Sequence, residues 1–333
     1  MSIVLFPALD GHRLAHLQQA AGETALCNAA DEPQALAAMP EARGFVGKIT
    51  PALLAAAPQL AWVQSPTASL EHYVFPELVE HPCVLTNMRG LYSDVVADHA
   101  LLLVLALARN LPTYIRQQQT GVWRPVGDPG LAPDFARGPG IATGADQAHT
   151  HLAESTLGVV GLGEIGLEIA CRGRALGMRV VAVDPRSGTA PAEVARLWPP
   201  EELGQLLAES DFVVIAAPHT PQTAGWFRRP QFQAMKRSAR LINVGRGAIV
   251  VLDDLAAALD AGEIAGAGLD VCETEPLPAE HPLWRMEQVI ITPHVAACSP
   301  RIAGRHLALL ADNVGRFVRG EPLRNVVDKR AWY

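Results

Sequence analysis

The stretch TLGVVGLGEIGLEIACRGRALGMRVVAVDPR, at residues 156–186, decides the fold of this chain. An apolar run at 157–160 leads into a Gly-x-Gly-x-x-Gly motif, and a helical pattern of apolar residues follows. A second apolar run at 180–183 ends in Asp184. This order predicts a strand, a tight turn, a helix and a second strand, which is one βαβ unit of a doubly wound parallel sheet.

The three glycines of the motif each have a physical role in binding a dinucleotide. Gly161 allows a turn that a Cβ atom would block, Gly163 lets the backbone approach a pyrophosphate, and Gly166 lets the helix pack closely on the strand. The start of the helix offers free N–H groups and the positive end of its dipole to the phosphates. A glycine-rich turn in another α/β protein is the alternative, but the flanking strand, helix and acid favour a dinucleotide site.

The acid at the end of the second strand bears on which dinucleotide binds. Asp184 follows Gly166 by 18 residues, close to the spacing of roughly 20 seen for the acid that accepts the ribose hydroxyls. A carboxylate at that position repels a 2′-phosphate, so Asp184 favours NAD. Arg186 leaves NADP open, because a nearby arginine can hold that phosphate.

Length and composition indicate a globular protein of two domains. The chain has 333 residues, of which 49% are hydrophobic and 18% charged, so it can bury large cores. The net charge of −7 gives no general attraction to nucleic acid or to an anionic membrane. We therefore expect a small-molecule substrate and no nucleic-acid partner.

The cysteines and the apolar segments favour a cytoplasmic location. The five cysteines are scattered and form no Cys-x-x-Cys pair, so neither a disulfide framework nor a zinc site is indicated. The N-terminal segment lacks the basic start of a signal peptide. The longest apolar run, at 100–108, is too short to span a bilayer. We expect no membrane segment.

The alternation of patterns along the chain predicts two α/β domains. Strand and helix patterns alternate regularly from 151 to about 295, which predicts a parallel, doubly wound cofactor domain, placed at residues 99–298. Residues 1–98 read as a second α/β unit without a glycine motif, and the tail after 298 is expected to return to it. The substrate domain would therefore be discontinuous, at 1–98 and 299–333. Residues 121–150, rich in Gly, Pro and Asp, are interpreted as a surface excursion.

Individual elements can be placed by the same patterns. Predicted helices cover 11–21, 50–57, 70–80, 94–118, 229–236, 253–261 and 298–318, and predicted strands in the two domains cover Ile3–Phe6, Gly44–Val46, Trp62–Gln64, Val84–Thr86, Leu157–Val160, Val180–Val183, Phe212–Ala217, Leu241–Val244, Ala267–Asp270 and Val289–Thr292.

Three polar residues follow strands of the cofactor domain and form a coherent chemical set. Ligands bind outside the carboxyl ends of strands in such a sheet, and Arg246, Glu275 and His294 all fall there. His294 can act as acid and base when a hydride passes between a 2-hydroxy acid and a 2-oxo acid. Glu275 would orient the imidazole, and Arg246 would grip the substrate carboxylate. The nicotinamide does the redox work, so no metal is needed.

Each of these residues also has an ordinary structural explanation. Arg246 could be a solvated turn residue, Glu275 a turn residue before proline, and His294 a capping residue. Their joint placement on one edge of the sheet favours function. The other histidines lack that support, and His99 is interpreted as a satisfied buried histidine on the helix at 94–118.

The residues as a whole resemble the D-isomer-specific 2-hydroxyacid dehydrogenases, which include glyoxylate/hydroxypyruvate reductases and phosphoglycerate dehydrogenases. The resemblance covers essentially the whole chain. It is carried by NMRGLYSDVVADHALLLVLALARNL, TLGVVGLGEIG with VVAVD, VVIAAPHTPQT, LINVGRG, GAGLDVCETEPLP and ITPHVAACSP.

The resemblance implies an NAD(P)-dependent oxidoreductase that interconverts a small 2-oxo acid, such as glyoxylate or hydroxypyruvate, and its D-2-hydroxy acid. It implies a Rossmann domain, a second flavodoxin-like α/β domain, a cleft between them, and a homodimer built through the cofactor domain. It assigns catalysis to Arg246, Glu275 and His294. Cofactor contacts, beyond the glycines and Arg186, fall on Glu164, Ile165, Asp184, Pro218, Thr223, Val244 and Asp270.

The chain departs from the family pattern in the loop SPTASLE at 65–71, where many members carry glycines. We expect backbone N–H groups of Thr67, Ala68 and Ser69 to hold the substrate carboxylate. Two alternative functions share the scaffold: an NAD-sensing binding protein that resembles the corepressors of this family, and a dehydrogenase of phosphite or formate.

Overall fold

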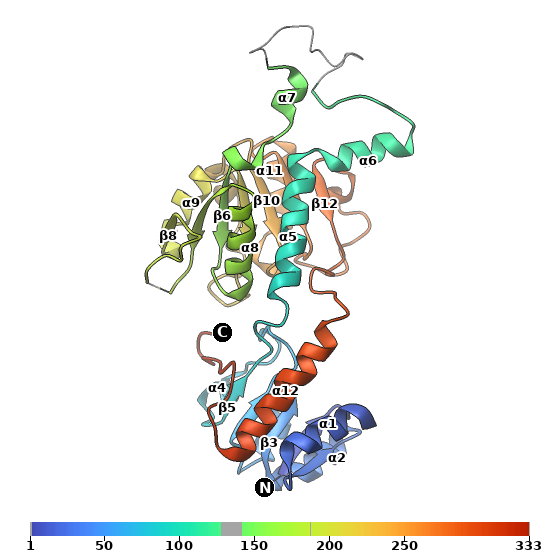
Figure 1. The fold of residues 1–333 in the computed structure, drawn as a ribbon, viewed down its shortest axis with the longest axis vertical. Coiled ribbons are helices and arrows are strands. Elements are labelled where there is room, and N and C mark those ends of the chain that lie inside the picture. The colour runs from blue at the N-terminus through green and yellow to red at the C-terminus, as the bar shows by residue number, and fades with distance from the viewer. Residues whose placement is uncertain (1, 128–141, 187, 333) are drawn as a thin grey trace. The chain divides into compact units, whose positions relative to one another are not determined.

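The structure, a computed structural model, describes residues 2–127, 142–186 and 188–332, which separate into two units (Figure 1). The first unit contains residues 1–92 and 299–333, and the second contains 93–298. The first boundary falls at residue 92 instead of the predicted 98, because helix α5 begins at Ser93 and packs as a whole on helix α8 of the second unit. Residues 128–141 of the predicted excursion lie outside the described residues.

The first unit is a five-stranded parallel sheet in the order β2-β1-β3-β4-β5, which is the flavodoxin-like order. Its strands are β1 (Ser2–Phe6), β2 (Ala25–Asn28), β3 (Ala42–Gly47), β4 (Trp62–Gln64) and β5 (Val84–Thr86). Its helices are α1 (Gly11–Ala21), α2 (Glu32–Ala38), α3 (Pro51–Ala55), α4 (Pro76–Glu80) and α12 (Ile302–Arg319), the last beside α1.

The C-terminal segment belongs to the first unit. Phe317 of α12 packs on the buried ring of Trp62, with ring centroids 5.0 Å apart. Asn313, fully buried, donates a hydrogen bond to the Oε1 atom of Gln64 at 2.9 Å. In the tail, Lys329 Nζ donates to the backbone carbonyls of Leu78, His81 and Cys83.

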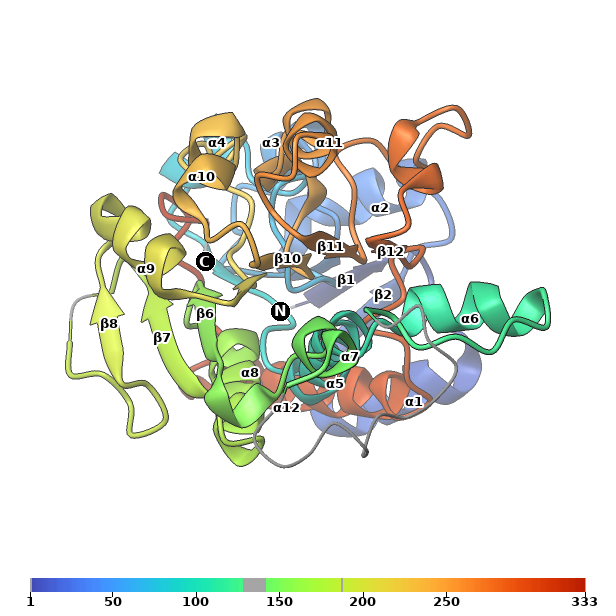
Figure 2. The ribbon, with the colours of Figure 1, turned by 90° about the horizontal axis from the view of Figure 1, so that it is seen from above.

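The second unit is a seven-stranded parallel sheet in the order β12-β11-β10-β9-β6-β7-β8. Helices α5 and α8 cover one face of the sheet, and α10 and α11 lie on the other (Figure 2). The strands are β6 (Thr156–Val160), β7 (Arg179–Val183), β8 (Arg196–Trp198), β9 (Phe212–Ile215), β10 (Arg240–Asn243), β11 (Gly266–Leu269) and β12 (Val289–Ile291). The helices are α5 (Ser93–Ala108), α6 (Leu111–Gln119), α7 (Gly144–Ala148), α8 (Glu164–Ala175), α9 (Leu203–Glu209), α10 (Arg229–Ala234) and α11 (Leu252–Asp260).

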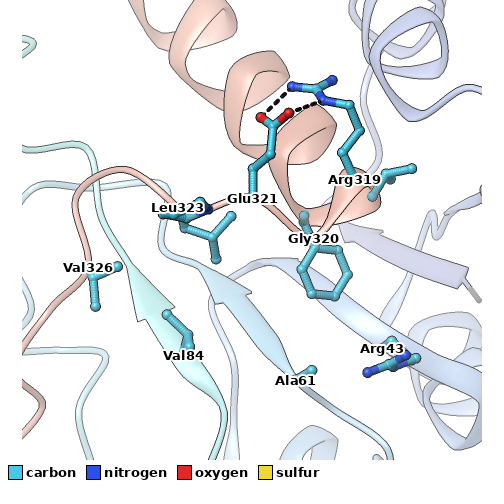
Figure 3. Close-up of a pocket in the computed structure, with 11 residues that line it drawn as sticks. Arg43, Ala61, Val84, Arg319, Gly320, Glu321, Leu323 and Val326 are labelled. Carbon is cyan, nitrogen blue, oxygen red and sulfur yellow. Dashed lines mark hydrogen bonds and ion pairs between the residues drawn. The ribbon is translucent and has the colours of Figure 1, made fainter.

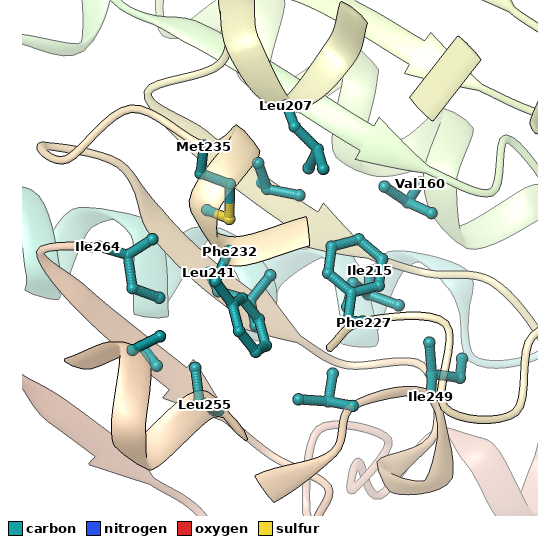
Figure 4. Packing of buried hydrophobic residues seen from close by; sticks show 14 of the residues in the cluster. Val160, Leu207, Ile215, Phe227, Phe232, Met235, Leu241, Ile249, Leu255 and Ile264 are labelled. Atoms are coloured by element: carbon teal, nitrogen blue, oxygen red, sulfur yellow. The ribbon is translucent and has the colours of Figure 1, made fainter. Parts of the chain in front are cut away.

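The core under α10 and α11 fixes the sheet from which the loops of the site emerge. Phe227 and Phe232 are fully buried there with Leu241 of β10 and Ile215 of β9 (Figure 4). Side chains of this size, fully removed from water, each stabilise the fold by about 1.5–3 kcal/mol.

Two predicted helices differ from the structure. The helix predicted at 94–118 is two helices, α5 and α6, because Asn110 adopts a left-handed backbone with φ 55° between them. The helix predicted at 70–80 begins only at Pro76, since proline is accommodated in the first turn of a helix. Strands β2 and β8 were not predicted; both are edge strands of four residues or fewer, which is too short to give a clear apolar pattern.

Among the described residues, no single helix has the length and apolar character to cross a membrane. Only α5 and α6 taken together pass that test of length and composition, and their axes are bent by 71° at the break.

Candidate active site

The predicted cofactor and catalytic residues follow strands of the second unit, at one edge of its sheet. All pairings in this sheet are parallel, so the loops after β6, β7, β9, β10, β11 and β12 start at the same edge. The strand order reverses between β6 and β9, which lie side by side. Ligands bind at such a switch point in open α/β sheets.

The glycine-rich turn after β6 has the geometry of a phosphate site. Gly161 has φ 90° and lies so near the backbone of Ala217 that a Cβ atom would be 2.7 Å away. A Cβ atom on Gly166 would overlap the carbonyl of Gly161. At Gly163, the N-cap of α8, a Cβ atom would enter open space, and no side chain caps the helix. The start of α8, which no side chain caps, and the helix dipole therefore fit a pyrophosphate.

Asp184 and Arg186 form a compact ion pair beside this turn. Arg186 donates through Nε to Asp184 Oδ1 at 2.7 Å and through Nη2 to Oδ2 at 3.0 Å. The N–H of Leu162, in the glycine turn, donates to Oδ2 at 2.7 Å. Burial raises the pKa of Asp184, but the hydrogen bonds from Arg186 and Leu162 outweigh it and hold the pKa below its ordinary value. The carboxylate is therefore ionised and already neutralised by its neighbour.

The loop after β10 presents Arg246 between two glycines that allow close approach to neighbouring loops. A Cβ atom on Gly245 would lie 2.7 Å from the carbonyl of Ala217, and one on Gly247 would overlap the carbonyl of Cys272. The fully buried Asn243 shapes this loop, since its amide donates to the Arg246 carbonyl and its oxygen accepts from the Gly245 N–H, both at 3.1 Å. Arg246 itself is partly exposed and donates to the Gly245 carbonyl at 2.8 Å.

Glu275 and His294, which are 19 positions apart in the sequence, form a direct pair. Nδ1 of His294 lies 2.7 Å from Oε2 of Glu275. The other carboxylate oxygen of Glu275 accepts the N–H of Cys272 at 2.9 Å, which fixes the orientation of the carboxylate. An ionised carboxylate only accepts hydrogen bonds, so Nδ1 carries the proton in this contact and Nε2 is not engaged by Glu275. The two side chains are 48% and 38% exposed, so both are reachable.

His294 is held in an unfavourable backbone conformation by the loop around it. Its φ is 53°, a left-handed value that costs a residue with a side chain about 1–2 kcal/mol. Asp270, only 2% exposed, supports this loop: its carbonyl accepts the His294 N–H at 2.8 Å, and its carboxylate accepts the N–H groups of Val295 and Ala296. The carboxylate of Asp270, predicted to contact cofactor, is thus engaged within the loop.

The remaining predicted cofactor residues occupy the same edge. Thr223 donates to the Pro218 carbonyl at 2.8 Å and accepts the N–H of Thr220, so these residues form a closed turn after β9. Glu164 and Ile165 form the first turn of α8, and Val244 is buried after β10. The patterns did not single out Thr220 or Asn243, which shape the loops from buried positions.

The predicted substrate residues belong to the first unit. The loop after β4 is closed by hydrogen bonds from Thr67 Oγ1 to the Ser69 carbonyl at 2.7 Å and from the Asn87 amide to the Ala68 carbonyl at 2.8 Å. His306 of α12 contacts the Pro66 carbonyl at 2.9 Å. The roles of Thr67, Ala68 and Ser69 in substrate binding stay a prediction.

A groove of about 660 Å³ in the first unit contains none of the predicted site residues (Figure 3). It is lined by apolar side chains such as Val84 and Val326, and by the ion pair of Arg319 with Glu321 at the end of α12. Its acidic group, Glu321, is paired with Arg319, and no glycine-rich turn of the phosphate-binding kind is in its lining.

The switch-point turn and the paired histidine define an oxidoreductase that binds a dinucleotide, and comparison with known proteins narrows this class. A family model described as the NAD binding domain of D-isomer specific 2-hydroxyacid dehydrogenase matches residues 101–296. Glyoxylate reductase of Korarchaeum cryptofilum is 34% identical over 82% of this chain and 78% of its own length. Glyoxylate/hydroxypyruvate reductase B of Cronobacter sakazakii is 31% identical over 99% of this chain and 98% of its own.

A solved structure has a similar fold. The D-isomer specific 2-hydroxyacid dehydrogenase of Xanthobacter autotrophicus Py2, in complex with NADPH and MES, is 29% identical and superposes with a TM-score of 0.78 over 100% of this chain and 99% of that one. The chain therefore belongs to the D-isomer specific 2-hydroxyacid dehydrogenases. It is an NAD(P)-dependent enzyme with the predicted fold of two parallel α/β sheets.

Proposed function

We propose that the protein reduces a small 2-oxo acid, such as glyoxylate or hydroxypyruvate, to its D-2-hydroxy acid, with His294 as the acid–base group. The observation that carries the proposal is the 2.7 Å contact of His294 Nδ1 with a carboxylate that is itself fixed by a backbone N–H. The names of the full-length relatives support this substrate class.

The mechanism follows from the residues around the reacting carbonyl. NAD(P)H, which the turn of Gly161, Gly163 and Gly166 would hold, would supply the hydride for the carbonyl carbon. Protonated His294 donates from Nε2 to the carbonyl oxygen, and neutral His294 takes that proton back when the alcohol is oxidised. Glu275 keeps a proton on Nδ1 and stabilises the imidazolium. Arg246 holds the substrate carboxylate through its guanidinium fork.

The proposal is tested by following NADH and NADPH oxidation with a panel of 2-oxo acids. His294→Ala should lower kcat by about 10²–10⁴-fold, the usual contribution of a positioned acid–base group. Glu275→Gln should also lower kcat, because the amide can orient the ring but cannot stabilise its charge. A matched control is His151→Ala, which removes an exposed histidine 3.8 Å from Glu154 in the same unit. A fully active His294→Ala enzyme would remove the assignment.

Two other functions are outcomes of the same experiment. Tight binding of NADH without turnover of any 2-oxo acid would favour the NAD-sensing role seen in corepressors that resemble this family. Turnover confined to phosphite or formate would favour a dehydrogenase of one of those two acids.

We also propose that the second unit forms a homodimer through the faces of α5 and α6. Leu102 and Leu105 on α5 are 53% and 41% exposed, and Leu111 and Ile115 on α6 are 42% and 46% exposed. Trp123, just after α6, is 91% exposed, and this group of apolar side chains is unusual for a monomer surface. Leu105→Glu should convert a dimer to monomer in sedimentation experiments, whereas Leu176→Glu, an exposed leucine of the same unit, should not. The roles of the two units and the cytoplasmic location stay predictions.

A further inference from the structure

His99, in the middle of α5, makes contacts that a merely buried histidine would not need. Its side chain is 14% exposed, and its Nε2 atom lies 2.9 Å from Thr292 Oγ1 and 3.5 Å from Asp270 Oδ1. Both neighbours lie on the candidate catalytic edge, at positions far from His99 in the sequence. The contact therefore joins a helix on one face of the sheet to the loop that carries His294.

The direction of the hydrogen bonds can be worked out from the donors available. Thr292 Oγ1 lies 2.6 Å from Asp270 Oδ1, and a carboxylate can only accept, so the single hydroxyl proton goes to Asp270. The oxygen of Thr292 is then an acceptor toward His99, which must carry a proton on Nε2. His99 thus donates to Thr292, and Thr292 donates to Asp270, so the three residues form a hydrogen-bond chain that runs in one direction.

This chain ends on the backbone that fixes the candidate acid–base residue. Besides Thr292, the carboxylate of Asp270 accepts the N–H groups of Val295 at 3.0 Å and Ala296 at 2.9 Å, and the Asp270 carbonyl accepts the N–H of His294. Asp270 therefore binds the backbone at His294, whose φ is 53°, and at the two residues after it. A residue held in such a conformation depends on surroundings that over-determine it.

We propose that His99 is a positioning residue for His294, acting through Thr292 and Asp270. This inference rests on the proposed role of His294 in reduction. His99 does not touch the reacting atoms; its Nε2–H keeps Thr292 pointed at Asp270, and Asp270 keeps the loop in place. Loss of that donor frees the loop, and a shift of about 1 Å at a reacting group can cost up to 100-fold in rate.

The test compares kcat, KM for the 2-oxo acid and the NADH dissociation constant in a set of variants. His99→Leu should lower kcat about 10- to 100-fold and change NADH binding less than about threefold. His99→Gln places an amide N–H near the position of Nε2 and should restore most of kcat. The matched control is His149→Leu, which removes another half-buried histidine, bonded to Tyr114 at 2.8 Å, and should leave kcat unchanged.

A double-mutant cycle identifies the route of the effect. In a Thr292→Val background, which breaks the chain, adding His99→Leu should lower kcat no further. The inference is overturned if His99→Leu keeps the wild-type kcat, if Gln fails to restore it, or if the two changes multiply. These outcomes differ from failure of the proposed function, in which the wild-type enzyme itself turns over no 2-oxo acid.

Discussion

Replacing Asp184 with asparagine should shift the preference of the enzyme from NADH toward NADPH. The carboxylate is 7% exposed and lies beside the glycine turn, where it accepts from Leu162 and from Arg186. Asparagine keeps one acceptor oxygen for the Leu162 N–H but removes the negative charge that repels a 2′-phosphate. It also removes the ion pair with Arg186, whose Nη2 still donates to the Leu162 carbonyl at 2.8 Å and so keeps the positive charge beside the turn.

The size of the effect follows from the charges involved. Two unit charges about 5 Å apart interact by about 3 kcal/mol at an effective dielectric constant of about 20. Arg186 already neutralises much of the carboxylate charge, and its side chain is 58% exposed, so solvent screens the remainder. We therefore expect a change of about 1.4 kcal/mol, which is about tenfold in the ratio of kcat/KM for NADPH to that for NADH.

The assay measures the ratio of kcat/KM for NADPH to that for NADH at low and at high salt. The proteins compared are the wild type, Asp184→Asn and Arg186→Ala. Asp184→Asn should raise the ratio about tenfold, and Arg186→Ala should lower it, because the carboxylate charge is then uncompensated. Salt should reduce both shifts. A ratio that stays constant in both variants, with thermal stability unchanged, would refute the idea that this pair sets the cofactor preference.

Two further predictions concern the loops of the site. Gly247→Ala should lower kcat strongly, by up to about 100-fold, because a Cβ atom there overlaps the Cys272 carbonyl and displaces the Arg246 loop; Gly204→Ala, in open space on α9, should leave activity unchanged. Burial, with the nearby charges of Glu275 and Asp270, raises the pKa of the Cys272 thiol to about 11, so iodoacetamide at pH 8 should label the exposed Cys298 and spare Cys272. Rapid labelling of Cys272 in the folded protein would contradict that environment.

The pair of Asp184 and Arg186 also predicts how stability responds to acid. The pKa of Asp184 is lower in the folded protein than in the unfolded chain, so its contribution is fully present above the unfolded value of about 3.9. It is lost as the pH falls through the lower folded value. Asp184→Asn should therefore flatten the acid limb of a plot of unfolding free energy against pH.

The fold could be predicted from the sequence where apolar runs and glycines act locally. The βαβ unit around Gly161 is such a case, because each of its elements is short and its turn needs glycine. The break at Asn110 was missed because the prediction followed the apolar pattern across it, although Pro112 in the first turn of α6 is a signal in the sequence that marks a helix start. Strand β8 was missed because an edge strand of three residues has too little buried surface to leave a pattern.

The candidate site was predictable in its exposed residues and not in its supports. His294 and Glu275 carry chemistry that their positions after strands suggest, and the structure pairs them. His99 gives no comparable signal, because its partner Thr292 lies 193 positions away and only the folded sheet brings them together. From the sequence, Asp184 was interpreted as favouring NAD and Arg186 as able to hold the phosphate of NADP. The ion pair that the two side chains form with each other was not predicted.

The first unit is built from two segments that the second unit separates in the sequence, and this has a consequence for its synthesis on the ribosome. Lys329 donates to three carbonyls in the segment from Leu78 to Cys83, and α12 packs along α1. Residues 1–92 leave the ribosome long before these partners exist, whereas residues 93–298 emerge as one continuous unit. The nascent sheet of residues 2–86 therefore stays incompletely covered until α12 and the segment around Lys329 have been synthesised.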